Sequence, residues 1–271
     1  MEHWRLIIHP PYSGAWNMAV DEAILESVAQ KLHPPTLRLY DWHPYSLSLG
    51  LAQPFSDVDT LSLAEKGWDI VRRPTGGRAI LHADEITYSI CAPDDDAHVS
   101  RSVLESYRIL STGLLKALQA FNIQADSKPK PPQDRQKNVN PVCFQSPSDY
   151  EITFQGKKLI GSAQARRLHG VLQHGAIPLF GDITRIITVL NYPTENARVE
   201  AKIQLQQYAT NMVELLGRKL AWQEAADALI LGFQDALDIQ FHQGNLSPEE
   251  KTTARQLYLE KYNNVQWTKR I

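Results

Sequence analysis

The sequence contains little cysteine, little net charge and no long apolar run, and each of these absences excludes a class of protein. Two cysteines among 271 residues do not make a disulfide framework, so we expect a reducing, cytoplasmic environment. The net charge of -2 creates no overall attraction to nucleic acid or to a membrane surface. No apolar run approaches the ~20 residues of a membrane span, and the first residues lack a signal-peptide pattern. The composition, 43% apolar, is typical of a soluble globular protein, and nothing in it demands more than a monomer.

The order of apolar patterns predicts an α+β fold, because strands dominate the middle of the chain and helices flank them. Helices are expected at 16–32 and 102–121, where apolar residues recur along one face. Strands are expected within 35–50, 67–92 and 149–167, the last as a hairpin.

The C-terminal part of the chain is expected to be largely helical from about Asp182 onward. A capped helix opens at Ser247 and Pro248, after a break at Gly244. We therefore expect one main domain over 1–243 and a C-terminal helical appendage over 244–271.

A carboxylate falls on the apolar face of the first predicted helix. Asp21 shares that face with Met18, Leu25, Val28 and Leu32. A buried carboxylate requires donors, and we expect an arginine of the glycine-rich loop described below to supply them.

The two cysteines have different surroundings. Cys91 lies in the apolar run ITYSICAP and is expected to fill the core. Cys143 lies between Pro141 and Pro147 in a polar segment, and a thiol is reactive where it is accessible and has a lowered pKa. These neighbours alone do not distinguish a reactive thiol from a packed one.

The stretch RRPTGGRAILH is the densest chemical signal in the chain. Gly76 and Gly77 allow backbone N–H groups to approach a ligand closely, since no Cβ intervenes. Arg72, Arg73 and Arg78 add cationic donors suited to a carboxylate, a phosphate or a developing oxyanion. The stretch has neither the Walker nor the dinucleotide-binding spacing of glycines. A tight turn with solvated arginines is the alternative.

A second signal is Lys158, which begins a predicted strand and precedes the small residues Gly161, Ser162 and Ala163. Small residues leave space beside the lysine, as a ligand slot needs. A lysine in a solvent-exposed turn is the alternative, because most lysines are exposed.

Histidines give weaker signals. His82 and His174 are candidates, but a lone histidine is more often structural, and nothing in the sequence places either one near Cys143. The spacing of cysteine and histidine fits no zinc site, so no metal is predicted.

Several of these motifs, taken in order, resemble the lipoate/octanoate transferase branch of the biotin–lipoate ligase superfamily. They are NMAVDEAIL, LRLYDWHPYSLSLGLAQ, RRPTGGRAILHADEITYSI, CFQSPSDYEI and GKKLIGSAQARRLHGVLQHGAI, and the match runs from about Trp4 to Gln234. The chain is most similar to octanoyltransferases with a Cys-Phe-x-x-Pro-Ser-x-Tyr-Glu signature. ATP-using ligases have a third glycine where this chain has Arg78, and they lack the cysteine. The resemblance implies a biotin/lipoate ligase-like catalytic domain over 1–243, with mixed β-sheets flanked by helices.

The resemblance also implies the roles of individual residues. It makes Cys143 the acyl-accepting nucleophile and Lys158 the group that lowers the pKa of its thiol. The predicted substrate-binding set is Arg73, Gly76, Gly77, Arg78, His82, Gly161, Ser162 and Ala163.

The family reaction moves an octanoyl group from acyl carrier protein to a lysine of a lipoyl-domain protein, commonly the glycine cleavage H protein. A thioester donor is already activated, so the resemblance implies no ATP, metal or soluble cofactor. Burial of about six methylenes at ~0.8 kcal/mol each gives roughly 5 kcal/mol, enough to select a medium chain over acetyl. The basic loop KPKPPQDRQK is expected to dock the acidic carrier, or else is a solvated linker. Its cations are Lys128, Lys130, Arg135 and Lys137.

Three other functions stay open at this point. An ATP-dependent lipoate or octanoate ligase would make an acyl-adenylate at the arginine and glycine loop and would not use Cys143. An octanoyl amidotransferase would move the acyl group between two lipoyl-domain proteins through the same cysteine. A non-catalytic acyl-binding or carrier-binding module would keep the pocket and tolerate loss of the thiol.

The proposed cysteine–lysine pair makes a demand on the fold. In a straight hairpin turning near Gln155, Lys158 faces a residue near Thr153, and Cys143 lies ten positions earlier. At ~3.3 Å per residue the two side chains would be roughly 30 Å apart. The segment 143–147 must therefore fold back over the sheet.

Overall fold

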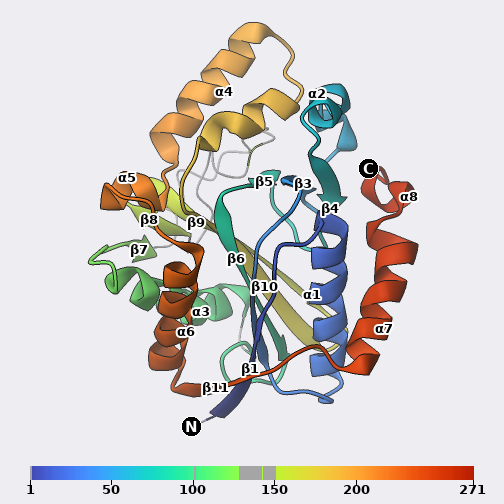
Figure 1. The fold of residues 1–271 in the computed structure, drawn as a ribbon, viewed down its shortest axis with the longest axis vertical. Helices are drawn as coiled ribbons and strands as arrows, with labels where there is room; N and C mark the ends of the chain where they lie inside the picture. The colour runs from blue at the N-terminus through green and yellow to red at the C-terminus, as the bar shows by residue number, and fades with distance from the viewer. Residues whose placement is uncertain (1, 101, 128–141, 143–150) are drawn as a thin grey trace.

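An eight-stranded mixed sheet forms the centre of the protein, with helices on both of its faces (Figure 1). The computed structural model describes residues 2–100, 102–127, 142 and 151–271. The strands lie in the order β11-β1-β2-β6-β10-β9-β8-β7. Their bounds are β1 Glu2–Ile8, β2 Thr36–Tyr40, β6 Glu85–Pro93, β7 Asp126–Ser127, β8 Ile152–Phe154, β9 Lys157–Arg167, β10 Gly170–Pro178 and β11 Ile239–Gln243. β1 pairs in parallel with β11 and β2, and the pairs from β2 to β7 are antiparallel. The predicted α+β class with mixed sheets is confirmed.

A second sheet contains three strands in the order β4-β3-β5. Their bounds are β3 Ser46–Leu49, β4 Asp69–Arg72 and β5 Ile80–His82. The strands predicted on both sides of Pro44 are present as β2 and β3, but they belong to different sheets. The glycine-rich stretch runs from the end of β4 into β5, and both of these strands pair with β3.

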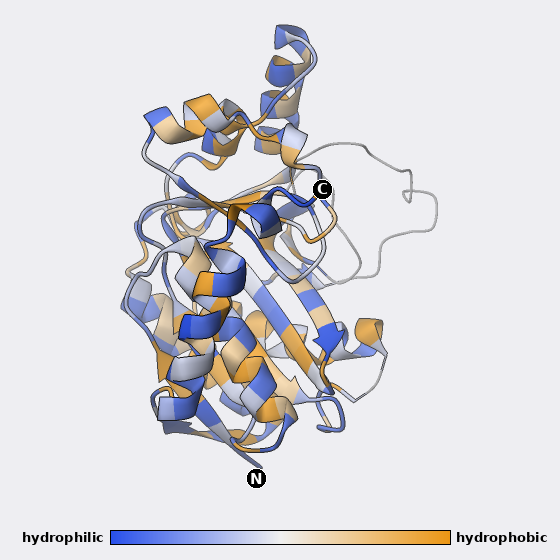
Figure 2. Ribbon diagram, turned by 90° about the vertical axis from the view of Figure 1, so that its right-hand side faces the viewer, coloured by the Kyte–Doolittle hydropathy of each residue, from blue (hydrophilic) through white to orange (hydrophobic). Residues whose placement is uncertain are grey.

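Helices cover the two faces of the large sheet. α1 lies on one face with α7 packed outside it, and α3 and α6 pack together on the other face (Figure 1). Figure 2 shows that most helices carry both hydrophilic and hydrophobic residues, as expected for helices with one face on a core. The helix bounds are α1 Gly14–Ala29, α2 Thr60–Glu65, α3 Val103–Gln119, α4 Glu195–Tyr208, α5 Met212–Leu216, α6 Trp222–Leu237, α7 Pro248–Leu257 and α8 Val265–Thr268. Shorter helical turns are η1 Phe55–Asp57, η4 Ile183–Val189 and η5 Tyr258–Tyr262.

The predicted capping box at the start of α3 is confirmed, since Ser102 accepts from the backbone N–H of Glu105 and Glu105 accepts from that of Ser102.

Close packing of α3 on α6 depends on Gly113. A Cβ at this position would lie 2.2 Å from the ring of Phe233.

The first helix ends earlier than its apolar pattern predicts. α1 ends at Ala29, and Lys31 adopts a left-handed φ of 58°. Leu32, which was expected on the apolar face, is therefore 65% exposed, whereas Met18, Leu25 and Val28 are buried.

The β8–β9 hairpin turns where the sequence predicts. Gln155 and Gly156 have φ values of 49° and 81°, typical of a two-residue hairpin turn. Thr153 pairs with Lys158, so the expected register is also confirmed.

The C-terminal part of the chain returns along the first helix. Ser247 and Glu250 form a capping box at the start of α7, and Glu250 also forms a buried ion pair with Arg5 of β1 at 2.6 Å. α7 packs against α1, and α8 lies beside β4. A domain boundary between 243 and 244 remains a prediction.

Candidate functional site

A cavity with about 310 Å³ of empty space, which includes space open to solvent, lies between the three-stranded sheet, strands β9 and β10, and α1. We call it the central cavity. It brings together four of the residues that the sequence predicts for the site, namely Arg73, His82, Gly161 and Ala163. The other described candidates, which are outside its lining, are Gly76, Gly77, Arg78, Lys158 and Ser162.

The alternation of side chains along β9 explains this division. Gly161 and Ala163 point to the face of the sheet that carries the cavity. Ser162 lies between them and points to the opposite face, where its hydroxyl is 2.7 Å from that of Tyr88. The ring of Tyr88 lies beside Phe233 of α6. Small residues at 161 and 163 therefore leave space for the cavity, but not beside Lys158 as the sequence predicted, because Lys158 is outside the lining.

Sequence reasoning missed several walls of the cavity. The apolar pattern of α1 indicated that Met18 is buried but not which site it faces. Aromatic residues near the end of β2 predicted only a strand and a turn. The missed residues include Met18, Tyr40, Trp42 and Ser48, whereas His174 was a weak candidate in the sequence.

The Arg73 side chain organises the glycine-rich loop. Its guanidinium donates to the carbonyls of Gly76 at 2.7 Å and Arg78 at 2.8 Å, and to the carbonyl of Ser48 at 3.0 Å. Gly77 has a φ of 92°, and a Cβ there would lie 2.8 Å from Arg73 Nη2. Gly76 and Gly77 are exposed and Arg78 is half-buried. The loop is thus curled around Arg73, with its two glycines at the surface.

His82 lies in a hydrogen-bonded chain along one wall of the cavity. Its Nε2 lies 2.8 Å from Ser48 Oγ and its Nδ1 lies 2.7 Å from Glu85 Oε1. The imidazole stacks on Trp42 with ring centroids 3.8 Å apart. Arg73 also donates to Ser48 Oγ at 3.1 Å, so this wall is joined to the glycine-rich loop.

A second chain contains Asp21, which is completely buried. Arg38 donates to it at 2.7 Å, and the hydroxyls of Tyr40 and Ser89 each donate at 2.8 Å. Burial alone would raise the pKa of Asp21, but the charge of Arg38 and the bond from His174 hold it below its usual value. The prediction that an arginine of the glycine-rich loop binds Asp21 is wrong, since the arginine that binds it, Arg38, comes from β2.

The loop reaches Asp21 indirectly, through His174. His174 Nε2 lies 2.7 Å from Thr75 Oγ1 in the loop, and its Nδ1 lies 3.5 Å from Asp21. Burial lowers the pKa of His174, so the imidazole is neutral at neutral pH. This histidine, which gave only a weak signal in the sequence, connects the loop to the buried carboxylate.

Lys158 is buried, with 0% exposure, which excludes the alternative of a solvent-exposed turn lysine. Its Nζ donates to the carboxylate of Glu151, which is also buried. The backbone carbonyl of Lys158 accepts from the N–H of Thr210 at 3.0 Å, and Lys158 and Ala209 form an isolated parallel β-bridge. The sequence gave no indication of Glu151 as the partner.

The predicted nucleophile Cys143 lies outside the described residues, as do Lys128, Lys130, Arg135 and Lys137. The residue before it, Val142, is described. It forms a bridge with Ala79, the residue before β5, and is buried. Val142 also lines a second cavity, of about 510 Å³, together with Ile80 and Leu205. Ile80 lines the central cavity as well, so the two cavities share a wall.

The other cysteine behaves as predicted. Cys91 is 1% exposed and lies in a core cluster with Ile24 and Leu172. Burial raises its pKa well above the ordinary thiol value. Its thiol is therefore an inert core group.

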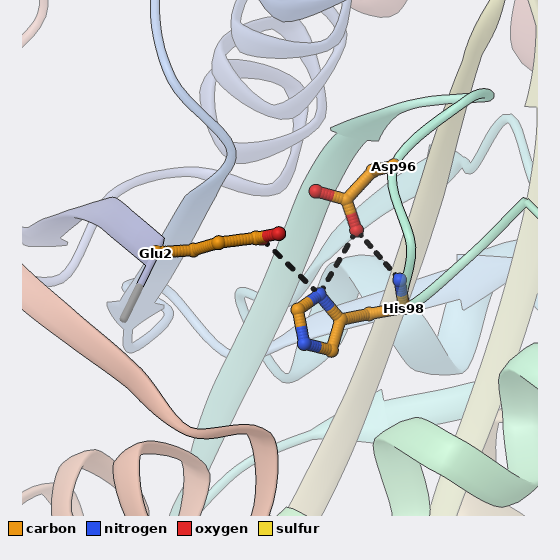
Figure 3. A group of neighbouring side chains, drawn as sticks. All are labelled: Glu2, Asp96 and His98. Carbon is orange, nitrogen blue, oxygen red and sulfur yellow. Dashed lines mark hydrogen bonds and ion pairs between the residues drawn. The ribbon is translucent and has the colours of Figure 1, made fainter.

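Among the described residues, Glu2, Asp96 and His98 form one group with ligand atoms within 4.8 Å of one another (Figure 3). His98 Nδ1 lies 3.1 Å from Asp96 and 3.7 Å from Glu2, and the hydrogen bond to Asp96 raises the pKa of His98. An ion pair accounts for this arrangement. The group lies near the start of β1, well away from β3, β4 and β5 (Figure 1).

Within the described part of the chain, the helices are too short or too polar to span a bilayer.

Residues 13–234 match the Lipoyl protein ligase A/B catalytic domain family, and the chain belongs to this family. A relative named Octanoyltransferase LipM from Kyrpidia tusciae is 39% identical, with 100% of both chains covered. A relative of the same name from Carboxydothermus hydrogenoformans is 38% identical, with 98% of each chain covered. A bi-partite lipoate protein ligase from Thermoplasma acidophilum has a similar structure, with a TM-score of 0.82, 23% identity and coverage of 99% and 97%. The family and fold indicated by the sequence motifs are confirmed.

Proposed function

We propose that this chain is an octanoyltransferase of lipoate biosynthesis that works through a thioester on Cys143. The observation that carries the proposal is the full-length similarity, at 38–39% identity, to relatives named as octanoyltransferases. The central cavity supports it, because a buried slot with walls that include Met18, Ile80 and Ala163 suits an apolar acyl chain.

The reaction consists of two acyl transfers. The Cys143 thiolate attacks the thioester carbonyl of the donor, the new thioester forms, and the carrier leaves as a thiol after taking up a proton. The neutral amine of an acceptor lysine then attacks the acyl-cysteine, an amide forms, and the proton from nitrogen restores the Cys143 thiol. Each step exchanges one activated acyl bond for another or for an amide, so neither step needs ATP.

The position of Val142 supports the fold-back that the mechanism requires. Val142 pairs with Ala79 beside the central cavity, and it lies in one apolar cluster with Leu205 and Ala209. Ala209 in turn forms the bridge to Lys158. The residue before Cys143 therefore shares an apolar cluster with the backbone partner of Lys158, rather than lying on a straight extension of β8.

The pairing of Lys158 with Glu151 adds a condition to the proposed role of the lysine. Held against a carboxylate, the ammonium belongs to a pair with no net charge. The ammonium stabilises the thiolate and the carboxylate destabilises it. The pair therefore favours the thiolate only if the ammonium is nearer to the sulfur than the carboxylate is. The proposal therefore requires Lys158 Nζ to lie nearer to Cys143 Sγ than the Glu151 oxygens do.

We assign acyl carrier protein as the donor and a lipoyl-domain protein, such as the glycine cleavage H protein, as the acceptor. Gly76, Gly77 and Arg78 then belong to the rim that the donor approaches, whereas Ser162 faces away from the cavity. Gly76 and Gly77 are exposed, which is consistent with that position. The cations at 128–137 would add attraction to an acidic carrier, and reversing them should slow association and flatten its salt dependence.

An ATP-dependent ligase is the second candidate, because the bi-partite lipoate protein ligase shares the fold. Arg78 stands where the ligases have a third glycine, which weighs against this candidate. An octanoyl amidotransferase would use the same residues and differ only in its donor.

Intact mass measurement separates these functions. The protein is incubated with octanoyl-acyl carrier protein without ATP, and the mass is measured for wild type and Cys143→Ala. An octanoyl adduct on wild type alone supports the transferase. Activity that appears only with ATP and free octanoate selects the ligase. Competition between octanoyl carrier protein and an octanoylated lipoyl-domain protein then decides the donor.

A further inference from the structure

The last residues of the chain return to the start of the glycine-rich loop. Residues 264–271, which include α8, lie beside β4, in the part of the molecule that holds β3 and β5 (Figure 1). We call 264–271 the C-terminal brace. It lies beyond residue 234, where the match to the catalytic-domain family ends.

Arg72, the last residue of β4, both donates hydrogen bonds to the brace and accepts one from it. Its completely buried guanidinium donates twice to the carbonyl of Thr268, at 2.8 and 3.0 Å. The indole N–H of Trp267 donates to the carbonyl of Arg72 at 2.8 Å. The side chain and the backbone of Arg72 are thus fixed together, one residue before Arg73.

The brace also holds the segment 50–53, which packs under the glycine-rich loop. Arg72 donates to the carbonyls of Gly50 at 2.8 Å and Gln53 at 2.6 Å, while the N–H of Leu51 donates to the carbonyl of Thr75 at 2.8 Å. The terminal residue Ile271 accepts from the N–H of Phe55 at 2.7 Å. Arg270 Nη2 of the brace donates to the carbonyl of Leu51 at 3.3 Å, so the segment has hydrogen bonds to both the loop and the brace.

Arg72 is one residue from Arg73 and three residues from Thr75, and both of these residues connect it to the central cavity. Arg73 lines the cavity, and Thr75 contacts His174, another lining residue. A shift of Arg72 would also displace Arg73 and Thr75. Residues 72, 73 and 75 are all buried, so the backbone between them has little freedom to rearrange.

We infer that the C-terminal brace positions the acyl site, with Trp267 and Arg72 as positioning residues. This inference rests on the proposed function, since it assigns the central cavity to the octanoyl chain. The brace acts through the loop and does not touch the substrate. Its loss is expected to weaken acyl-donor binding more than it slows acyl transfer at saturation.

Two variants test this inference. Trp267→Phe keeps an aromatic ring and removes the donor to Arg72, and a chain that ends at residue 263 lacks the whole brace. One lost hydrogen bond predicts a rise of about fivefold in the KM for octanoyl-acyl carrier protein in Trp267→Phe, with kcat within about twofold of wild type. The truncated chain should show a larger rise. Val265→Ala is the matched control, because Val265 belongs to the brace and is 58% exposed.

Amide hydrogen exchange separates positioning from general stability. In Trp267→Phe, exchange should accelerate at 49–53 and 72–78 and stay unchanged in β10. An unchanged KM, or equal acceleration in β10, overturns the inference and leaves the proposed function standing. If wild type forms no octanoyl adduct, the proposed function fails, and exchange at the loop still reports whether the brace holds it. If the truncated chain does not fold, Trp267→Phe decides alone.

Discussion

At the scale of single residues, the site depends on buried charges whose partners lie on other elements of the fold. Lys158 meets Glu151 across the β8–β9 hairpin, and Asp21 of α1 meets Arg38 of β2. Burying an isolated charge is costly, so removing either partner leaves the other as an uncompensated buried charge. The stability of this region and its electrostatics are therefore coupled.

The coupling of Lys158 and Glu151 is testable by a double-mutant cycle. Lys158→Met leaves a buried carboxylate without its partner, and it should lower the free energy of unfolding by about 3–5 kcal/mol. Adding Glu151→Leu should restore most of that loss, while acyl-enzyme formation stays impaired in both variants. Urea unfolding of the four proteins measures the cycle. Single losses that simply add in the double variant would contradict the pairing.

Acid sensitivity is expected from the histidines around Arg38. His9 Nδ1 accepts from Arg38 Nε at 2.9 Å, and burial together with Arg38 lowers the pKa of His9 to about 3. The unfolded chain takes up this proton below pH about 6.5, whereas the folded chain does not, so stability falls as pH falls from about 6.5 toward 3.

Replacing His9 should reduce this slope. His9→Asn keeps an acceptor for Arg38 but has no proton to take up, so its unfolding free energy should fall less steeply between pH 6.5 and 4.5. Chemical unfolding at a series of pH values measures the slope. His169→Asn is the control, because the His169 side chain is 92% exposed. Equal slopes for wild type and His9→Asn would show that the folded protein does not hold His9 in its neutral form.

At the scale of elements, the contact between 50–53 and the glycine-rich loop is the tightest near the site. A Cβ at Gly50 would lie 1.9 Å from the carbonyl oxygen of Gly77, which is backbone and has little freedom to move. Gly50→Ala should lower the unfolding free energy by about 1–3 kcal/mol and raise the donor KM. The exposed Ala52→Ser in the same segment is the control, and a Gly50→Ala variant with wild-type stability and KM would contradict the contact.

Local elements were predictable where one short pattern decides them. The capping box at Ser102 and the turn at Gln155–Gly156 need only adjacent residues, and both are present where expected. The end of α1 was not predictable from its apolar pattern, because the left-handed conformation at Lys31 stops the helix before Leu32. Apolar periodicity reports which face is buried and does not report where the helix ends.

At the scale of the whole molecule, the class of fold and four cavity residues followed from sequence, but the arrangement around them did not. The separation of β2 and β3 into two sheets creates the space for the central cavity. The return of 264–271 to Arg72 joins residues far apart in the chain, and the pairs Asp21–Arg38 and Lys158–Glu151 join residues of different elements. No local pattern encodes such contacts, because they depend on how the layers assemble.

The most direct test of the account is the pKa of the Cys143 thiol, measured from the pH dependence of its alkylation by iodoacetamide in a Cys91→Ala background. The account predicts a pKa at least about one unit below the ordinary thiol value of ~8.5. It also predicts a return toward that value in the Lys158→Met/Glu151→Leu variant, which removes both charges. An ordinary thiol pKa in the starting protein, unmoved when the charged pair is removed, would contradict the proposed catalytic pair.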